Sequence, residues 1–379
     1  MQGLDLWHNQ PLDTGKTQLQ SVLEDIARHI QIQPNFWMGH SLYPPLELRA
    51  EVFNGLRLLP LDLQDQYLRL RLGSYIYNFY GTSREKNRIE PNVDSEQGTH
   101  RESSAQNMAQ GVHSSFYKNL HRNNSGQGYF DSGWFVLRET SDGLLAVQKD
   151  GLTLHVSRDR HLRPMEQSVT IGETVAVHLP RNCIESGCYV AVGNQGPVQS
   201  SETEHCQIVD VYFNLGAEAI VTVMGDLTAA LNHLSLPFTF KVPYETDECD
   251  RYDTAVLNCD KSRYAQIQPV LATLYQSHQS AFRPEVPLFS KQLAPGLALA
   301  EDPLERFTPQ ESFSINRCQT AADGLLKAWR EGRESPEDRM NAILESFAEQ
   351  HIDLEHPYLN SGSMDCYPSI MDSAKVMAS

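Results

Sequence analysis

Apolar residues near the start of the chain recur at the spacing of a helix face. They lie three and four positions apart at Leu19, Val22, Leu23, Ile26 and Ile30. This period is typical of an amphipathic α-helix that buries one side. A second aliphatic and aromatic run of the same kind extends from Asp65 to Tyr80. The pattern predicts an N-terminal helical region over residues 1–81.

The composition changes over residues 82–124. Ser, Asn, Gln, Gly, Arg and Glu dominate this stretch, and few apolar residues interrupt them. A segment with so little apolar surface gains too little from burial to offset the entropy of ordering its backbone. We therefore predict a flexible linker here.

Short alternating segments follow the predicted linker. They are rich in β-branched and aromatic residues, and Gly, Asn, Asp and Pro stand between them, as in residues 134–137, 152–156, 175–177, 189–192, 209–213, 220–223, 237–242 and 254–257. Such runs are typical of strands joined by turns. Helical patterns occur near residues 226–234, 264–274, 316–329 and 336–350. The sequence predicts an α+β fold, with a mostly antiparallel sheet domain, helices packed on it and C-terminal helices, over residues 125–379.

The charge balance excludes two classes of binding protein. The chain has 379 residues and a formal net charge of -17. Non-specific binding to nucleic acid or to an anionic membrane requires a basic surface, so neither is expected.

No stretch approaches the roughly 20 apolar residues of a membrane span. The N-terminus has no basic segment followed by an apolar run, so we expect a cytoplasmic protein.

Motifs for metals and nucleotides are missing from the sequence. The seven cysteines are an odd number without CxxC spacing, which argues against a zinc site and a disulfide framework. His155 and His161 stand six apart, which is not a recognised metal spacing. No P-loop, GxGxxG, GxSxG or HExxH pattern occurs. We expect neither a metal nor a cofactor.

Two strand patterns aim polar side chains away from the core. In an extended strand, successive side chains point to opposite faces, so Phe238 and Phe240 face the core and Lys241 faces the other way. The same alternation places Leu154 inward and His155 outward. A pocket shared by Lys241 and His155 is the functional interpretation. The plain alternative is a solvated lysine and a surface histidine.

Further cations follow Lys241 along the chain. They are Arg251, Arg283, Lys291 and Arg317. Several stand beside acidic residues, and ordinary ion pairing is the alternative interpretation of each. In a chain this acidic, a group of cations favours one pocket for a phosphate or carboxylate group.

Several segments together resemble the HopA-type (HopPsyA) effector family. The resemblance covers roughly residues 119–326, in the order expected for that family. The matching segments are residues 133–134, 149–155, 237–241, 250–257, 283–303 and 311–318. The chain before residue 119 carries less of the resemblance.

The resemblance implies two functions, one of a pathogen effector and one of a lyase. Founding members of the family are named as plant-pathogen effectors. Relatives in class V lanthipeptide and thioamitide pathways are taken to be lyases that act after a kinase-like partner. The implied activity is a metal-independent phosphoserine or phosphothreonine lyase, which leaves dehydroalanine or dehydrobutyrine by β-elimination. Its implied substrate is a precursor peptide in ribosomal peptide maturation or a phosphorylated protein.

The resemblance also implies roles for single residues. β-Elimination needs a base for the Cα proton, a proton donor and cations around the departing phosphate. A lysine can be the base where neighbouring cations or desolvation disfavour an ammonium. Thr153 stands where related lyases carry a lysine before their histidine. The implied assignments are Lys241 as base, His155 as acid, Arg251, Lys291 and Arg317 as phosphate ligands, and Lys149 as the substitute for the missing lysine.

Two alternatives to catalysis stay open from the sequence. One is a non-catalytic effector-type module that binds an acidic or phosphorylated partner. The other is a scaffold in which the cations are scattered. A Lys241 that faces His155 would favour the lyase, whereas a Lys241 paired with a carboxylate would favour the binding module.

Overall fold

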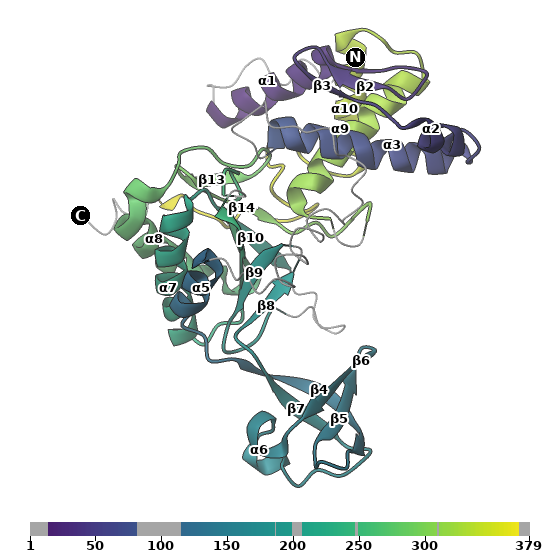
Figure 1. The fold of residues 1–379 in the computed structure, drawn as a ribbon. Coiled ribbons are helices and arrows are strands. Elements are labelled where there is room, and N and C mark those ends of the chain that lie inside the picture. Colours follow the sequence, from purple (N-terminus) through teal and green to yellow (C-terminus); the bar gives the residue numbers. More distant parts are fainter. Residues whose placement is uncertain are drawn as a thin grey trace. The chain divides into compact units, whose positions relative to one another are not determined.

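The computed structural model describes residues 14–81, 115–185, 187–198, 207–246, 249–308 and 311–370 (Figure 1). The chain forms two compact units. Unit 1 consists of residues Met1–Glu96, Val286–Gln292 and Ala298–Tyr367, and unit 2 consists of Gln97–Glu285, Leu293–Leu297 and Pro368–Ser379.

Unit 1 combines helices from both ends of the chain. Its N-terminal elements are α1 (Thr14–His29), α2 (Ala50–Leu56), α3 (Leu61–Ile76) with a π-helical turn (Tyr77–Gly81), and an antiparallel sheet of β1 (Ile30–Ile32), β2 (Met38–His40) and β3 (Tyr43–Leu46). Its C-terminal elements are α9 (Phe313–Arg330) and α10 (Pro336–Glu349). α9 packs on α3 and α10, and α10 packs on α1. The predicted N-terminal region is thus mainly helical, with a small sheet that the periodicity did not indicate.

Two glycines allow the close approach of these helices. A Cβ atom at Gly73 of α3 would lie 2.5 Å from Cγ of Gln319 on α9. A Cβ atom at Gly324 of α9 would lie 2.5 Å from Cα of Ile343 on α10. Only a residue without a side chain fits these contacts. α10 begins at an N-cap in which Ser335 Oγ accepts a hydrogen bond from the Asp338 N–H (3.0 Å).

Unit 2 contains a large antiparallel sheet with the strand order β10-β12-β11-β9-β8. The strands are β8 (Asn182–Glu185), β9 (Cys188–Val192), β10 (Ile208–Phe213), β11 (Thr239–Pro243) and β12 (Ala255–Asp260). The hairpin of β13 (Lys291–Ala294) and β14 (Leu297–Glu301) has residues in both units. Its turn lies beside the end of β10, where the Asn214 N–H donates to the Gly296 carbonyl (2.9 Å).

Helices cover one face of this sheet. They are α5 (Ser115–Asn123), α7 (Ala217–His233) and α8 (Tyr264–His278), which lie together on that side in Figure 1, with short 3-10 turns at Lys261–Arg263 and Gln279–Ala281. Phe238, Phe240 and Val242 are fully buried, whereas Lys241 is partly exposed. The predicted alternation along this strand is confirmed. Lys241 therefore stands on the face opposite the helices.

A second antiparallel sheet of unit 2 has the strand order β6-β5-β4-β7. Its strands are β4 (Tyr129–Glu139), β5 (Leu145–Lys149), β6 (Leu152–Val156) and β7 (Thr174–Leu179), and α6 (Arg158–His161) and a 3-10 turn (Pro164–Glu166) join β6 to β7. Asp150 and Gly151 have φ angles of 50° and 78°. Two such residues between paired strands make a tight hairpin. Trp134, Val136 and Val147 lie in its buried apolar cluster.

The fold class is α+β with antiparallel sheets, as the sequence predicted. Most of the predicted linker, residues 82–114, lies outside the described residues, and its last part forms α5. Residues 220–223, expected as a strand, are instead helical and belong to α7, because Ile220, Val223 and Met224 all lie on its buried side. Among the described residues, no helix is both long and apolar enough to cross a membrane.

Candidate anion-binding site

Lys241 is paired with a carboxylate on the edge strand of the large sheet. Its Nζ reaches across β9 and lies 3.3 Å from Glu185 Oε1 on β8. The side chains are 36% and 57% exposed. Exposed pairs of this kind contribute about 1 kcal/mol or less to stability. Lys241 is therefore held in place by a partner that another anion can replace.

Arg251 holds a second carboxylate. Its Nε and Nη2 donate to the two oxygens of Asp253 at 2.9 and 3.1 Å. The Thr254 hydroxyl donates to the Arg251 carbonyl (2.6 Å), which fixes the backbone of this turn before β12. The Asp253 side chain is only 11% exposed. A two-pronged contact with so little exposure is harder to replace than the contact between Lys241 and Glu185.

Both cations act on the thiol of Cys188. Burial raises the pKa of Cys188, the positive charges of Arg251 and Lys241 oppose this rise, and the negative charges of Glu185 and Asp253 add to it. These five residues form what we call the Lys241 cluster. It contains two positive and two negative side chains, so an anionic ligand competes with carboxylates that are already there.

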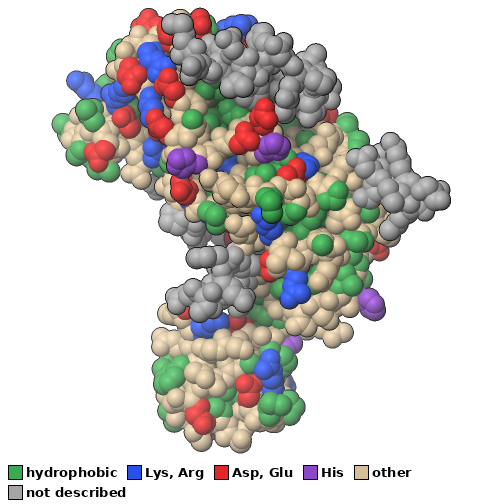
Figure 2. Space-filling model, turned by 180° about the vertical axis from the view of Figure 1, so that it is seen from behind, with side chains coloured by type: hydrophobic (Ala, Val, Ile, Leu, Met, Phe, Trp, Pro, Cys, Tyr) green, Lys and Arg blue, Asp and Glu red, His purple; other side chains and the backbone are tan. Residues whose placement is uncertain are grey.

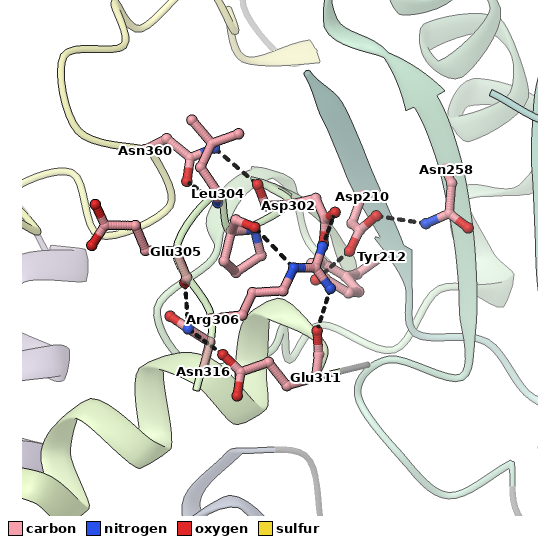
Figure 3. A network of polar contacts seen from close by, with 11 residues as sticks. Asp210, Tyr212, Asn258, Asp302, Leu304, Glu305, Arg306, Glu311, Asn316 and Asn360 are labelled. Atoms are coloured by element: carbon pink, nitrogen blue, oxygen red, sulfur yellow. Dashed lines mark hydrogen bonds and ion pairs between the residues drawn. The ribbon is translucent and has the colours of Figure 1, made fainter. Parts of the chain in front are cut away.

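The same face continues as a row of polar side chains on three strands. The Thr239 hydroxyl donates to Asn258 Oδ1 (2.8 Å), and Asn258 Nδ2 donates to Asp210 Oδ1 (2.5 Å). The Tyr212 hydroxyl donates to Asp210 Oδ2 (3.4 Å), as Figure 3 shows beside the Asn258 contact. This row was not predicted from the sequence. Its signal was the alternation Val209-Asp210-Val211-Tyr212, in which two polar residues share one face.

His155 lies in the other sheet of unit 2. It is an exposed residue of β6 opposite Ala146 of β5. Its electrostatic effect is felt at Asp142, whose pKa is lowered first by the Thr140 hydroxyl and to a smaller extent by His155. Within the described residues, Lys241 and His155 have different neighbours and share no contact. The expected pocket for both is not seen there.

Lys149 clamps a carboxylate inside the small sheet. Its Nζ lies 2.8 Å from both oxygens of Asp131 and 2.8 Å from the Ser132 carbonyl. The Trp134 indole also donates to Asp131 (2.7 Å), and Asp131 is 9% exposed. Lys149 thus neutralises a nearly buried charge.

Replacement of this lysine is expected to weaken the small sheet. Lys149→Met keeps the aliphatic stem but leaves Asp131 without its cation, which we expect to cost about 2 kcal/mol. Hydrogen exchange at the β4 amides of the full chain measures this loss. Arg138→Met is the matched control, because it removes an exposed cation from β4, the strand that also carries Asp131. Equal protection in both variants would contradict the clamp.

Lys291 and Arg317 have partners inside unit 1. Lys291 forms an ion pair with Asp365, and its Nζ lies 5.3 Å from the centre of the Tyr358 ring. Arg317 is 3% exposed and donates to the carbonyls of Pro357 (2.9 Å) and Leu359 (3.2 Å). Both cations tie the segment after α10 to the rest of the unit.

Arg317 belongs to a wider polar network in unit 1. It donates to Asn316 Oδ1 (2.6 Å), and Asn316 Nδ2 donates to Glu311 Oε1 (2.5 Å). Figure 3 shows Asn316 and Glu311 beside Arg306, whose Nη1 donates to the Glu311 carbonyl (2.9 Å). Figure 2 shows Lys and Arg interspersed with Asp and Glu on the surface of this unit. Arg330 forms an ion pair with Asp65 (2.6 Å). These cations serve structural contacts.

The predicted site residues are therefore only partly brought together. The charges of Lys241 and Arg251 both act on the pKa of Cys188, whereas Lys149 and His155 lie in the small sheet. Among the described residues, no three His, Cys, Asp or Glu side chains are grouped as metal ligands. The cluster is suited to binding an anion through an ammonium and a guanidinium group.

The comparisons with known proteins identify a family for this part of the chain. Residues 179–359, which include the Lys241 cluster, match the HopA1 effector protein family. Two solved structures of effector proteins are similar. The one from Pseudomonas syringae pv. tomato strain DC3000 has 17% identity and a TM-score of 0.33, and the match covers 46% of this chain and 63% of that one. The one from Pseudomonas syringae pv. syringae strain 61 has 11% identity and a TM-score of 0.38, with 93% and 100% covered.

No curated protein matches the chain. The matched residues begin just before β8 and end after α10, so they take in the large sheet of unit 2 and the C-terminal helices of unit 1. The family predicted from the sequence segments is confirmed. Over residues 179–359 the chain carries a domain of the HopA1 effector protein family.

Proposed function

We propose that the Lys241 cluster binds a phosphorylated or acidic side chain of a peptide or protein partner without chemical turnover. One observation carries this proposal. Lys241 and Arg251 each hold a carboxylate, at 3.3 and 2.9 Å, and the charges of both act on the pKa of the Cys188 thiol. The cluster is thus built to hold anionic oxygen atoms.

The chemistry of the two cations favours a phosphate group. A lysine ammonium is a compact point charge, and an arginine guanidinium presents a planar fork that matches oxyanions. Glu185 is the carboxylate that a ligand displaces, since its side chain is 57% exposed and that of Asp253 is 11% exposed. A phosphate carries close to two negative charges near neutral pH, so it competes well against one carboxylate. A kinase-like partner would supply such a group.

The partners of Lys241 and His155 favour binding over elimination. An ammonium in an ion pair has no lone pair for a Cα proton, and Lys241 is paired with Glu185. The expected proton donor, His155, lies on another sheet. Elimination requires base and acid to be positioned around one substrate. Binding requires only the cations.

A binding experiment with mass spectrometry tests the proposal. The full chain is titrated with a phosphothreonine peptide and with its unphosphorylated form, and the peptide is then recovered and weighed. We expect affinity for the phosphopeptide alone and recovery of the peptide with its phosphate. Equal affinity for both peptides would refute the proposal.

The second candidate function is the phosphoserine or phosphothreonine lyase. The observation in its favour is that the charges of one candidate base, Lys241, and one candidate phosphate ligand, Arg251, both act on the pKa of the same thiol. In that reaction the base removes the Cα proton, the C–O bond breaks with its electron pair, and inorganic phosphate leaves as the double bond forms. A recovered peptide that has lost phosphoric acid would establish this activity in place of simple binding.

Glu185 is expected to act as a competitor of the ligand. Glu185→Gln removes the negative charge 3.3 Å from Lys241 Nζ while keeping the size of the side chain. We expect roughly threefold to tenfold tighter binding of the phosphopeptide, since the Glu185 carboxylate no longer competes with the phosphate for Lys241 or repels it. Isothermal titration at low salt measures the change. Glu218→Gln, on α7 of the same unit, removes a charge from the covered side of the sheet and is the control. Unchanged or weaker binding by the Glu185 variant would contradict displacement.

A further inference from the structure

Strand β8 forms an edge of the large sheet. Among the strands of the described residues its only neighbour is β9, with the pairs Asn182↔Ala191, Cys183↔Val190, Ile184↔Tyr189 and Glu185↔Cys188. Cys183 is exposed, and Ile184 is 45% exposed. An edge strand presents unpaired backbone groups that can pair with another chain. β8 is therefore a place where an extended segment can be added to the sheet.

The register shows which backbone groups face outward. Glu185 and Cys188 are separated by two positions and close the hairpin, so this pair exchanges hydrogen bonds. The Val192 N–H donates to the Arg181 carbonyl (2.9 Å), which fits the same alternation. It follows that the backbone N–H and C=O groups of Cys183 also bond to β9, whereas those of Asn182 and Ile184 point away from it. Within the described residues, no backbone hydrogen bond involves these outer groups.

The side chains of β8 join this edge to the Lys241 cluster. Glu185 lies on the same face as Lys241, and alternation places Cys183 there too. Burial and the Glu185 charge raise the pKa of Cys183, and the Lys241 charge opposes this rise. The Cys183 thiol is therefore affected by the same two charges as the Cys188 thiol. Neighbouring strands are about 4.8 Å apart. Because Lys241 Nζ already reaches β8, a side chain on the next strand outward lies within its range.

We propose that the partner adds to β8 as an extended β-strand and places a phosphorylated side chain beside Lys241. This inference rests on the proposed function of the Lys241 cluster and names its binding mode. Backbone hydrogen bonds to Asn182 and Ile184 supply affinity that does not depend on sequence. Alternate side chains of the added strand lie on the same face as Cys183 and Glu185. A phosphorylated residue at one of these positions lies next to the Lys241 ammonium group.

A phosphorylated peptide fits this edge better than a second copy of the chain. β8 has four residues, and pairing over so short a strand buries far less than the roughly 1,200 Å² of a stable protein interface. Pairing of two β8 strands also brings a second Glu185 carboxylate to an edge that already has one, without adding a phosphate for Lys241. A phosphopeptide adds a charge-assisted contact that compensates for a short pairing.

The test removes a single backbone donor. Ile184→Pro lacks the outward N–H, and proline is tolerated on an edge strand where its nitrogen faces solvent. Ile184→Ala is the matched control, because it loses the side chain and keeps the N–H. With a phosphothreonine peptide, we expect Ile184→Pro to bind about tenfold more weakly and Ile184→Ala to bind like the unchanged protein. Circular dichroism tests whether both variants are folded.

The outcomes separate this inference from the proposed function. If Ile184→Pro binds normally while Lys241→Ala does not, strand addition is refuted and anion binding stands. If both bind normally, the proposed function fails. If Ile184→Pro does not fold, the unchanged protein is titrated with phosphopeptides that are N-methylated at one position each. Strand addition then predicts that methyl groups on alternate residues abolish binding, and uniform tolerance refutes it.

Discussion

Lys241→Ala is expected to weaken binding of a phosphothreonine peptide by roughly tenfold to a hundredfold. A hydrogen bond to a charged group contributes about 1.5–3 kcal/mol, and each 1.4 kcal/mol is a factor of ten. The substitution also leaves Glu185 without its cation at 3.3 Å, so its charge repels the ligand. Isothermal titration at two salt concentrations measures the loss, which should be smaller at high salt because salt screens exposed charges.

Lys118→Ala is the control for this effect. Lys118 is exposed on α5, which covers the other face of the sheet, so the variant has the same net charge without touching the cluster. Equal loss in both variants would reduce the effect to the net charge of the protein. Lys241→Arg separates the two candidate functions, since arginine keeps the charge for binding but cannot accept a proton in a lyase reaction.

Arg317→Ala is expected to destabilise unit 1 by about 3 kcal/mol or more. Arg317 is 3% exposed, and its loss leaves the carbonyls of Pro357 and Leu359 and the amide of Asn316 short of a donor. Each buried acceptor without a partner costs about 1–3 kcal/mol. The aromatic contact with Phe313, at 4.8 Å, is lost as well. Hydrogen exchange at the α9 amides during urea denaturation measures the change.

Arg330→Ala on the same helix is the matched control. Its ion pair with Asp65 is exposed at 30% and 38%, so we expect a loss of about 1 kcal/mol or less. A similar loss in both variants would mean that Arg317 is no more important to the fold than a surface arginine. A stable Arg317→Ala variant that no longer binds phosphopeptide would instead restore Arg317 as a phosphate ligand.

Local patterns predicted much of the fold. The three and four residue spacing from Leu19 to Ile30 is a property of one helix, and α1 spans Thr14–His29. Alternation at Phe238, Phe240 and Val242 is likewise local, because strand geometry alone separates the two faces. The error at residues 220–223 has a local cause too. A run of β-branched residues suits a strand or a buried helix equally, and packing selected the helix.

The sequence by itself determined the HopA1 resemblance of residues 179–359, the α+β class and the face of the strand from which Lys241 projects. The tertiary structure decided what each cation touches. Glu185 lies 56 positions before Lys241, and the carbonyls that bind Arg317 lie 40 and 42 positions after it. An ion pair depends on where distant segments meet, and no local period records that. Lys241 is thus aimed by its own strand, but β8 gives it a carboxylate, and this contact favours binding over catalysis.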